Sequence, residues 1–489
     1  MKRIPPYDLY AILGVSERAS ADDIRSAYRS AARRFHPDVN AHEGAALQFR
    51  DIAAAYEVLS DEQARSRYRV PIPQKSFTSR CITSKRVLPI LEEPQVLYLL
   101  LEISPQIKTD TPQQRHPLNV SLVLDRSSSM RGVRMDRLKV AAHQILEHLT
   151  TEDRLSIVSF SDRADVLMSS DQFSSGSDAR ALINTITPGG GTEIYQGLQA
   201  GYDQVKNYFN RNMVNHIILV TDGRTYGDEN QALDLADEAR EKGIGISAMG
   251  IGDEWNDDFL DALVSRTGGS SAYINSPAAV IRFLEDRIRS LGEAFAERMR
   301  LTVAPDNDVQ LEMVFRMMPN AQPLDHSSQP IQLGTLEGTR SMAVLLQFQM
   351  PAGMSSGFRN VARIDVSGDI LGQSDRFEYK TINDQSVETM LNPSPEDPPP
   401  VILDALGKLT LYRMQQKTEQ AISNGKFDEA TRRLENMATR LLEMGQPELA
   451  EMAQSEAKRV SRTKSLSETG RRTLKFGTRL LLAPPKSKD

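Results

Sequence analysis

The side chains best suited to chemistry lie in the middle of the chain, where hydroxyl and carboxylate groups follow strand-like apolar runs. The run "NVSLVL" leads directly into "DRSSSM", which places Asp125, Ser127 and Ser129 at alternate positions of one short loop. A second run, "HIILVT", ends at Asp222, and Thr192 follows three glycines in "TPGGGTEI". Such oxygen atoms are hard ligands that suit Mg²⁺ or Mn²⁺ rather than a soft metal. In doubly wound sheets, ligand sites lie beyond the carboxyl ends of strands, so these loops fall where a site is expected.

The segment "SADDIRSAYRSAARRF" predicts an amphipathic helix with two separate stripes. Ser20 can cap its N-terminus, and two aspartates fall in the first turn, where the helix dipole favours them. Apolar residues recur at spacings of three and four, which predicts a buried stripe made of Ile24, Ala27, Tyr28, Ala31 and Phe35. Arginines recur every four residues and predict a basic stripe made of Arg25, Arg29 and Arg33.

This helix ends at the triplet His36-Pro37-Asp38. Pro37 stops it, because proline has no N–H to donate and disfavours helical geometry at the residue before it. A second amphipathic helix, "AALQFRDIAAAYEVLS", follows, so the two helices are expected to pack as an antiparallel hairpin. His36 and Asp38 would then lie at its exposed tip, beside the basic stripe. The alternative is an ordinary loop next to a solvated face.

The elements that position these residues change in type along the chain. Strands alternating with helices predict a mostly parallel, helix-covered sheet in the middle, and strand runs without helices predict a β-sandwich after it. The expected order is a helical domain over 5–70, a linker over 71–80, a β segment over 81–116 that pairs with the later sandwich, an α/β domain over 117–290, the sandwich over 291–390, a proline-rich linker over 391–400, a helical hairpin over 401–460 and a basic tail over 461–489. The tail is expected to be a flexible end or a strand packed on the sandwich.

The bulk composition narrows the classes of function. The formal charge of −6 gives no reason to expect nucleic acid as a partner. Cys81 is the single cysteine, which excludes an internal disulfide framework and a cysteine-cluster zinc site, and suits a reducing compartment. No apolar run reaches the roughly 18 residues of a membrane helix, and the N-terminus has no signal-peptide pattern. We therefore expect a cytoplasmic protein without a membrane span.

Residues 7–68 resemble a J domain, the signature of DnaJ-type co-chaperones. The matching segments are "YDLYAILGV", "ASADDIRSAYRSAARRFHPDVN" and "ALQFRDIAAAYEVLSDEQARSRY", in the family's order. The resemblance implies that a DnaK-type chaperone is the partner and that its ATP hydrolysis is stimulated by His36, Pro37 and Asp38. It also implies docking contacts from Arg25, Arg29 and Arg33. Arg69 stands where the family often has aspartate, and the glycine/phenylalanine-rich segment and zinc-binding cysteines of many DnaJ proteins are absent.

Residues 117–280 resemble a von Willebrand factor type A (VWA) domain with its metal-ion-dependent adhesion site. The resemblance implies an Mg²⁺ or Mn²⁺ site whose ligands are Asp125, Ser127, Ser129, Thr192 and Asp222, with a carboxylate of a partner protein at an open position. Two carboxylates leave a divalent ion short of negative charge, which favours an acidic protein ligand. No histidine or glutamate is obviously placed to activate a metal-bound water, so hydrolysis is less expected. The alternative is a structural loop without metal.

Together these features predict a multidomain α plus α/β protein: an N-terminal helical J domain, a central doubly wound, Rossmann-like VWA domain with a flanking β-sandwich, and a C-terminal helical hairpin. The preferred function is a co-chaperone, not itself an enzyme, that binds a protein partner or client through the VWA domain. A second hypothesis is a scaffold or regulatory subunit that works with a separate AAA+ ATPase, since this sequence has no phosphate-loop motif. An enzyme in its own right is the least favoured hypothesis, because no nucleophile–base set or cofactor fingerprint occurs.

Overall fold

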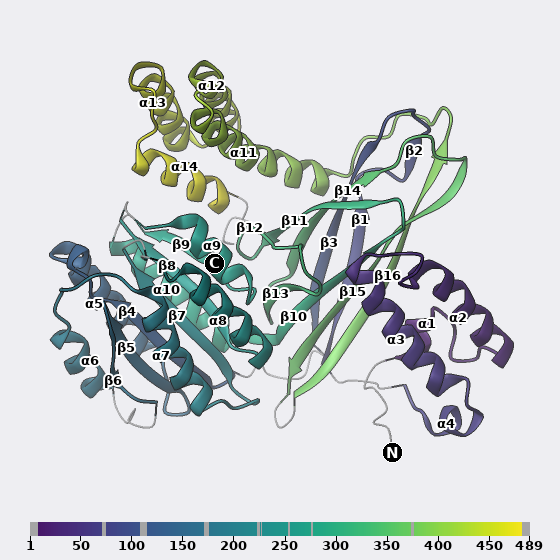
Figure 1. The fold of residues 1–489 in the computed structure, drawn as a ribbon, viewed down its shortest axis with the longest axis horizontal. Coiled ribbons are helices and arrows are strands. Elements are labelled where there is room, and N and C mark those ends of the chain that lie inside the picture. Colours follow the sequence, from purple (N-terminus) through teal and green to yellow (C-terminus); the bar gives the residue numbers. More distant parts are fainter. Residues whose placement is uncertain are drawn as a thin grey trace.

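The computed structural model describes residues 8–70, 75–107, 115–170, 176–222, 225, 227–252, 255–274, 277–372 and 376–481. Figure 1 shows a central β-sandwich with an α/β domain on one side, the N-terminal helices on the other and the C-terminal helices above. This architecture confirms the predicted fold class. Within the described ranges, no helix is both long and apolar enough to cross a membrane.

The N-terminal domain is a helical hairpin with two short flanking helices. Its elements are α1 (Leu9–Leu13), α2 (Ala21–Phe35), α3 (Glu43–Leu59) and α4 (Glu62–Arg67). Ser20 and Asp23 form a reciprocal capping box at the start of α2, as the sequence indicates for Ser20. The helix ends at His36, whose extended backbone precedes Pro37.

Two five-stranded sheets make up the sandwich. The strands are β1 (Lys75–Thr83), β2 (Val87–Pro89), β3 (Gln95–Ile107), β10 (Ala294–Pro305), β11 (Gln310–Met318), β12 (Gln322–Pro323), β13 (Ile331–Glu337), β14 (Met342–Met350), β15 (Gly357–Leu371) and β16 (Arg376–Met390). Their orders are β1-β3-β14-β11-β12 and β13-β10-β15-β16-β2. The early β segment thus pairs with the later sandwich, since β3 lies between β1 and β14. Residues 75–80, expected in a linker, form the start of β1, and residues 71–74 and 108–114 lie outside the described residues.

The α/β domain has a six-stranded sheet of order β6-β5-β4-β7-β8-β9. The strands are β4 (Leu118–Asp125), β5 (Arg154–Phe160), β6 (Ala164–Met168), β7 (Val214–Thr221), β8 (Gly245–Ile251) and β9 (Ser271–Ile274), and only the edge strand β6 is antiparallel. The helices are η1 (Ser128–Met130), α5 (Val133–Glu147), α6 (Gly176–Thr185), α7 (Ile194–Asn207), α8 (Glu229–Lys242), α9 (Asp257–Ser265) and α10 (Pro277–Gly292). Separate apolar clusters fill its two faces, one under α5, α6 and α10 and the other under α7, α8 and α9.

Four helices form the C-terminal domain, where the sequence predicts a hairpin followed by a basic tail. They are α11 (Pro400–Ser423), α12 (Phe427–Glu443), α13 (Pro447–Thr463) and α14 (Glu468–Leu480). The expectation of a flexible tail or a strand is wrong for 468–480, because this basic segment is a packed helix. Residues 482–489 lie outside the described residues.

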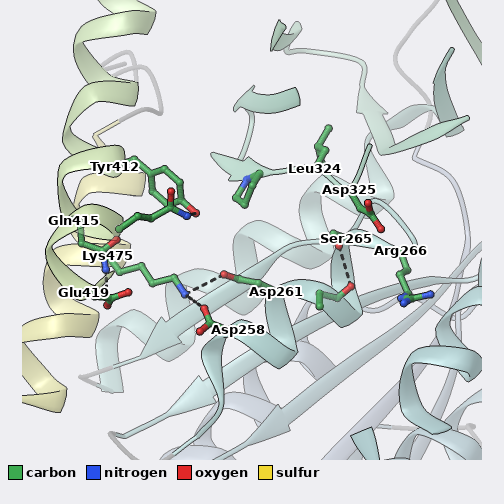
Figure 2. A pocket seen from close by; sticks show the side chains of 13 residues that line it. Asp258, Asp261, Ser265, Arg266, Leu324, Asp325, Tyr412, Gln415, Glu419 and Lys475 are labelled. Carbon is green, nitrogen blue, oxygen red and sulfur yellow. Dashed lines mark hydrogen bonds and ion pairs between the residues drawn. The ribbon is translucent and has the colours of Figure 1, made fainter. Parts of the chain in front are cut away.

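Buried charges on α14 bind the C-terminal domain to the α/β domain. Lys475 contacts Asp257, Asp258 and Asp261 of α9, and Arg479 donates to Asp261 at 2.5 and 3.0 Å. Burial disfavours the charged Lys475, but the neighbouring carboxylates, Asp261 first, raise its pKa. Figure 2 shows Lys475 pointing at Asp258 and Asp261, on the wall of a cleft of about 350 Å³ shared by α9, the β12 region, α11 and α14. The basic tail therefore joins domains.

A buried arginine joins the α/β domain to the sandwich. The Arg316 guanidinium on β11 donates to the carbonyl oxygens of Gly268 and Gly269, at 2.8 and 2.7 Å. Both carbonyls belong to the turn between α9 and β9, and Gln322 donates to the second at 2.9 Å. Hydrogen bonds from a charged donor are stronger than neutral ones, so this turn is held against the sandwich.

The N-terminal helices pack against the sheet that contains β10, β15 and β16. Gly44 in α3 lies so close to β10 that a Cβ atom there would be 2.0 Å from the carbonyl oxygen of Val303. Ala304 of β10 and Ile382 of β16 belong to the same apolar cluster as the helices. The core of the N-terminal domain therefore continues into the sandwich.

A buried ionic network reinforces this contact. Lys380 of β16 bridges Asp51 of α3, at 2.5 Å, and Asp365 of β15, at 2.8 Å. Gln48 of α3 donates to the same Asp365 at 3.0 Å. The Lys380 and Asp365 side chains are only 10% and 3% exposed. Removing one partner of a buried ion pair typically costs about 3–5 kcal/mol, so the network holds the N-terminal domain in one orientation.

Gly44→Val tests whether the N-terminal domain is docked. The added side chain would collide with the backbone of β10, while leaving the tip at His36–Asp38 untouched. We expect trypsin cleavage at Arg67 and Arg69 to rise about tenfold, because proteolysis follows the population of the open form. Ala46→Val, at an exposed position of the same helix, is the control. Equal cleavage of both variants would contradict the docked arrangement.

Candidate functional site

The carboxyl ends of β4 and β7 are neighbours, and they bring the two predicted aspartates to one edge of the sheet. Leu124 pairs with Val220, so Asp125, the last residue of β4, lies level with Thr221, the last residue of β7, and Asp222 comes directly after Thr221. Asp125 is fully buried, and each of its carboxylate oxygens accepts a hydrogen bond. The Ser127 backbone N–H donates to Oδ1 at 2.7 Å, and the Thr221 hydroxyl donates to Oδ2 at 2.6 Å. These bonds fix the orientation of the Asp125 carboxylate.

Both predicted serines connect to Asp222. The Ser129 hydroxyl donates to Asp222 Oδ1 at 2.7 Å, and the Ser127 and Ser129 hydroxyl oxygens are 2.8 Å apart. Asp222 is fully buried, and its Oδ2 accepts from the Arg134 guanidinium at 2.7 Å. Asp125, Ser127, Ser129 and Asp222 are thus brought together by a continuous chain of hydrogen bonds.

Thr192 lies on the glycine-rich loop beside this chain. The Gly190 carbonyl oxygen accepts from Ser128 N–H at 3.0 Å, and Gly189 N–H donates to the Arg126 carbonyl at 2.7 Å. Gly190 has φ +87°, and a Cβ there would meet Asp162 at 2.5 Å, so this position requires glycine. The two loops are therefore bonded to each other, with Thr192 buried two residues further on.

Burial sets the electrostatics of the edge. Desolvation raises the pKa of Asp125 to about 6, and the neighbouring Asp222 carboxylate adds to the rise, although hydrogen bonds from Thr221 and Ser127 oppose it. Two buried carboxylates at one edge thus create a demand for positive charge.

The donor set fits a hard divalent cation. The five predicted residues offer only carboxylate and hydroxyl oxygens, the ligands that Mg²⁺ and Mn²⁺ prefer. Within the described ranges, no three His, Cys, Asp or Glu side chains gather as a metal cluster. A cation at this edge would therefore draw on the hydroxyl groups and on two carboxylates only.

Sequence reasoning missed two residues at this edge. Thr221, the last residue of β7, holds Asp125, and Arg134, in the first turn of α5, holds Asp222. Arg134 could have been noticed in the sequence, because the dipole of a helix disfavours a positive charge in its first turn. An arginine at such a position indicates a nearby carboxylate.

The other predicted site lies at the end of α2. Pro37 is exposed, and the His36 and Asp38 side chains are 43% and 88% exposed. His36 Nδ1 accepts from Asp38 N–H at 3.2 Å, and the imidazole edge packs on Phe49 at 5.0 Å between ring centroids. Two residues further on, the buried Asn40 donates to the Pro305 carbonyl of β10 at 2.9 Å. The sandwich thus holds the base of the loop while its tip remains accessible.

The predicted basic stripe on α2 is exposed at Arg25, Arg29 and Arg33. Arg25 also pairs with Asp22 at 2.8 Å, but both side chains are more than half exposed, so this pair adds little stability. Arg34 points the other way and pairs with sandwich aspartates. The helix therefore presents one basic face outward and uses another arginine for docking.

Comparison with known families identifies three regions. Residues 8–69 match the DnaJ domain, residues 119–286 match the von Willebrand factor type A domain, and residues 400–484 match the Sll0103-like C-terminal alpha-helical domain. The protein carries a J domain and a VWA domain, as the sequence resemblances predict. The J domain indicates a DnaK-type chaperone as partner, and the VWA domain indicates protein interaction.

Among individual proteins, the chain is 29% identical over 398 residues to the uncharacterized protein sll0103 of Synechocystis sp., covering 79% of this chain and 93% of that protein. Over 61 residues it is 52% identical to the chaperone protein DnaJ of Staphylococcus carnosus, covering 12% of this chain and 16% of that protein. The second match is therefore confined to the J domain.

A solved structure described as a von Willebrand factor type A from Catenulispora acidiphila has a similar fold. Its TM-score is 0.66 at 14% identity, covering 84% of this chain and 98% of that chain. Because the match extends far beyond the VWA domain, the arrangement of the larger part of this chain also occurs in that protein.

The raised pKa of Asp125 predicts a pH dependence of stability without metal. A carboxyl whose folded pKa exceeds its unfolded value of 3.8 stabilises the fold at low pH, and this contribution is lost as pH rises through about 6. Asp125→Asn removes the titration. In EDTA, we expect its stability relative to wild type to increase by about 2 kcal/mol between pH 4 and 7.5.

The single tryptophan, Trp255, is buried in the VWA core, so its fluorescence reports unfolding of this domain. Parallel pH profiles of wild type and Asp125→Asn would contradict the raised pKa.

Proposed function

We propose that this protein is a co-chaperone that brings a DnaK-type chaperone to a protein partner held by its VWA domain. The J domain stimulates ATP hydrolysis by the chaperone through His36, Pro37 and Asp38, and docks on it through Arg25, Arg29 and Arg33. The VWA domain holds the partner through Mg²⁺ or Mn²⁺ ligated by Asp125, Ser127, Ser129, Thr192 and Asp222. The protein itself has no catalytic residues in this proposal.

The observation that carries the proposal is the presence of two features on one scaffold: an exposed tip on the J domain and a buried, oxygen-lined edge on the VWA domain. The exposed tip of the J domain and the oxygen-lined edge of the VWA domain belong to domains on opposite sides of one β-sandwich (Figure 1). Buried contacts centred on Lys380 and Arg316 attach each domain to that sandwich. Fixed attachment keeps chaperone and partner near one another, which raises their effective concentration.

The side chains at the J-domain tip and at the VWA edge suit the two proposed partners, the chaperone and the bound protein. Asp38 is an exposed carboxylate beside a basic surface, so it can pair with a cationic group on an acidic partner and set the register of binding. At the VWA edge, a bound divalent ion would supply positive charge that attracts a carboxylate of the partner. Asp125 and Asp222 would hold that ion, and the serine and threonine hydroxyls would complete its oxygen environment.

ATPase stimulation tests the J-domain half of the proposal. We expect the full chain to accelerate single-turnover ATP hydrolysis by a DnaK-type chaperone, and His36→Gln or Asp38→Asn to reduce the rate to that of the chaperone alone. Glu17→Gln, which changes another exposed carboxylate of the J domain, should behave as wild type. Full stimulation by His36→Gln would refute this half.

Affinity capture tests the VWA half. In Mg²⁺, the wild-type chain is expected to retain a specific protein from a lysate of its source cells, and EDTA or Asp125→Ala to release it. The control is Asp165→Asn, an exposed aspartate near the same edge whose partner is Arg126. Capture of the same protein after Asp125→Ala would rule out metal-dependent binding of the partner by the VWA domain.

A further inference from the structure

At the edge of the VWA sheet that carries the predicted metal ligands, the chain supplies a positive charge of its own, the guanidinium of Arg134. Asp125 and Asp222 are both fully buried, and buried carboxylates are strongly destabilising unless a positive charge or hydrogen bonds compensate them. Asp125 is compensated in part by the hydrogen bonds from Thr221 and Ser127. For Asp222, the compensating charge is the Arg134 guanidinium, whose Nη1 lies 2.7 Å from Oδ2.

The position of Arg134 is specific to this role. The same Nη1 also donates to the Ser129 carbonyl at 3.2 Å, so the arginine contacts two of the five predicted ligand residues. Its side chain is 29% exposed, and it packs beside Gly252, where an added Cβ would lie 3.1 Å from Arg134 Nε. Because the residue is in the first turn of α5, the helix dipole opposes its charge. The contact with Asp222 compensates for this unfavourable location.

We propose that Arg134 is a tethered counter-ion that neutralises Asp222 in the absence of metal and is displaced when a divalent cation binds. The inference rests on the proposed metal function of this edge. The Asp222 carboxylate serves either the guanidinium or the metal, so each cation weakens the hold of the other. Arg134 therefore lowers the metal affinity of the site and stabilises the metal-free fold.

Two properties follow from this competition. The VWA domain stays folded at low metal concentration, because Asp222 is never left without a positive charge. The competition also disfavours monovalent cations, because replacing the guanidinium by another unit charge adds no positive charge at the two carboxylates, whereas a divalent ion does. Partner binding then becomes sensitive to the concentration of free divalent metal.

Calorimetric titration of the full chain with Mn²⁺, together with the Tm in EDTA followed by Trp255 fluorescence, tests the inference. We expect Arg134→Gln to bind Mn²⁺ about tenfold more tightly than wild type. We also expect its Tm to fall in EDTA and to return to the wild-type value in saturating Mn²⁺. Arg134→Lys, which keeps the charge, should give an intermediate Mn²⁺ affinity and remain folded in EDTA.

Arg126→Gln is the matched control, because Arg126 directly follows Asp125 at the end of β4 but pairs with the exposed Asp165. Equal Mn²⁺ affinity of wild type, Arg134→Gln and Arg134→Lys would overturn the inference while leaving the metal function intact. A Tm deficit of Arg134→Gln that persists in saturating Mn²⁺ would also overturn it, since that result marks a purely structural arginine. If none of the chains bound Mn²⁺ at millimolar concentration, the metal function itself would fail, and the inference with it.

Discussion

The contact of Lys380 with the carboxylates of Asp51 and Asp365 is the constraint on which the arrangement of this protein depends. It joins the J domain to the sandwich in a buried setting, where an unpaired charge would be costly. Gly44 permits the close approach of α3 to β10 that this contact requires. Without such docking, the J domain would be a tethered module free to take any orientation. With it, the tip at His36–Asp38 has a defined position relative to the rest of the chain.

Charge balance governs the VWA edge in a similar way. The parallel sheet places Asp125 and Asp222 at the ends of neighbouring strands, where both side chains are fully buried. Burial disfavours the charged form of both carboxylates, so a positive charge placed beside them is strongly favourable. Arg134 supplies positive charge to Asp222 from within the chain, and Thr221 donates a hydrogen bond to Asp125. The same physics makes the edge a candidate for a divalent cation and gives Arg134 its proposed competing role.

The fold class was predictable because its signals are local. Apolar runs such as "NVSLVL" and "HIILVT" are typical of buried parallel strands, and in the structure they belong to β4 and β7. Strand β16 lies within the predicted sandwich range of 291–390, but its contact with the J domain could not be predicted, because it depends on single polar residues such as Lys380 and Asp384. Helix α14 was missed because its mixture of basic and apolar residues was interpreted as a flexible end or a strand packed on the sandwich, whereas Lys475 and Arg479 pair with α9. Motif spacing pointed to side chains that the structure brings to one edge of the sheet, and their role as metal ligands stays a prediction. Thr221 and Arg134 act through partners distant in sequence, so motif spacing did not include them.

The central claim is that one chain holds its partner and recruits the chaperone at the same time. The most direct measurement is ATP-dependent transfer of a captured partner from this protein to a DnaK-type chaperone, in the presence of Mg²⁺. His36→Gln and Asp125→Ala chains should each fail to support transfer, and an equimolar mixture of the two should fail as well, because the sites must act within one molecule. Restoration of full transfer by the mixture would contradict the account.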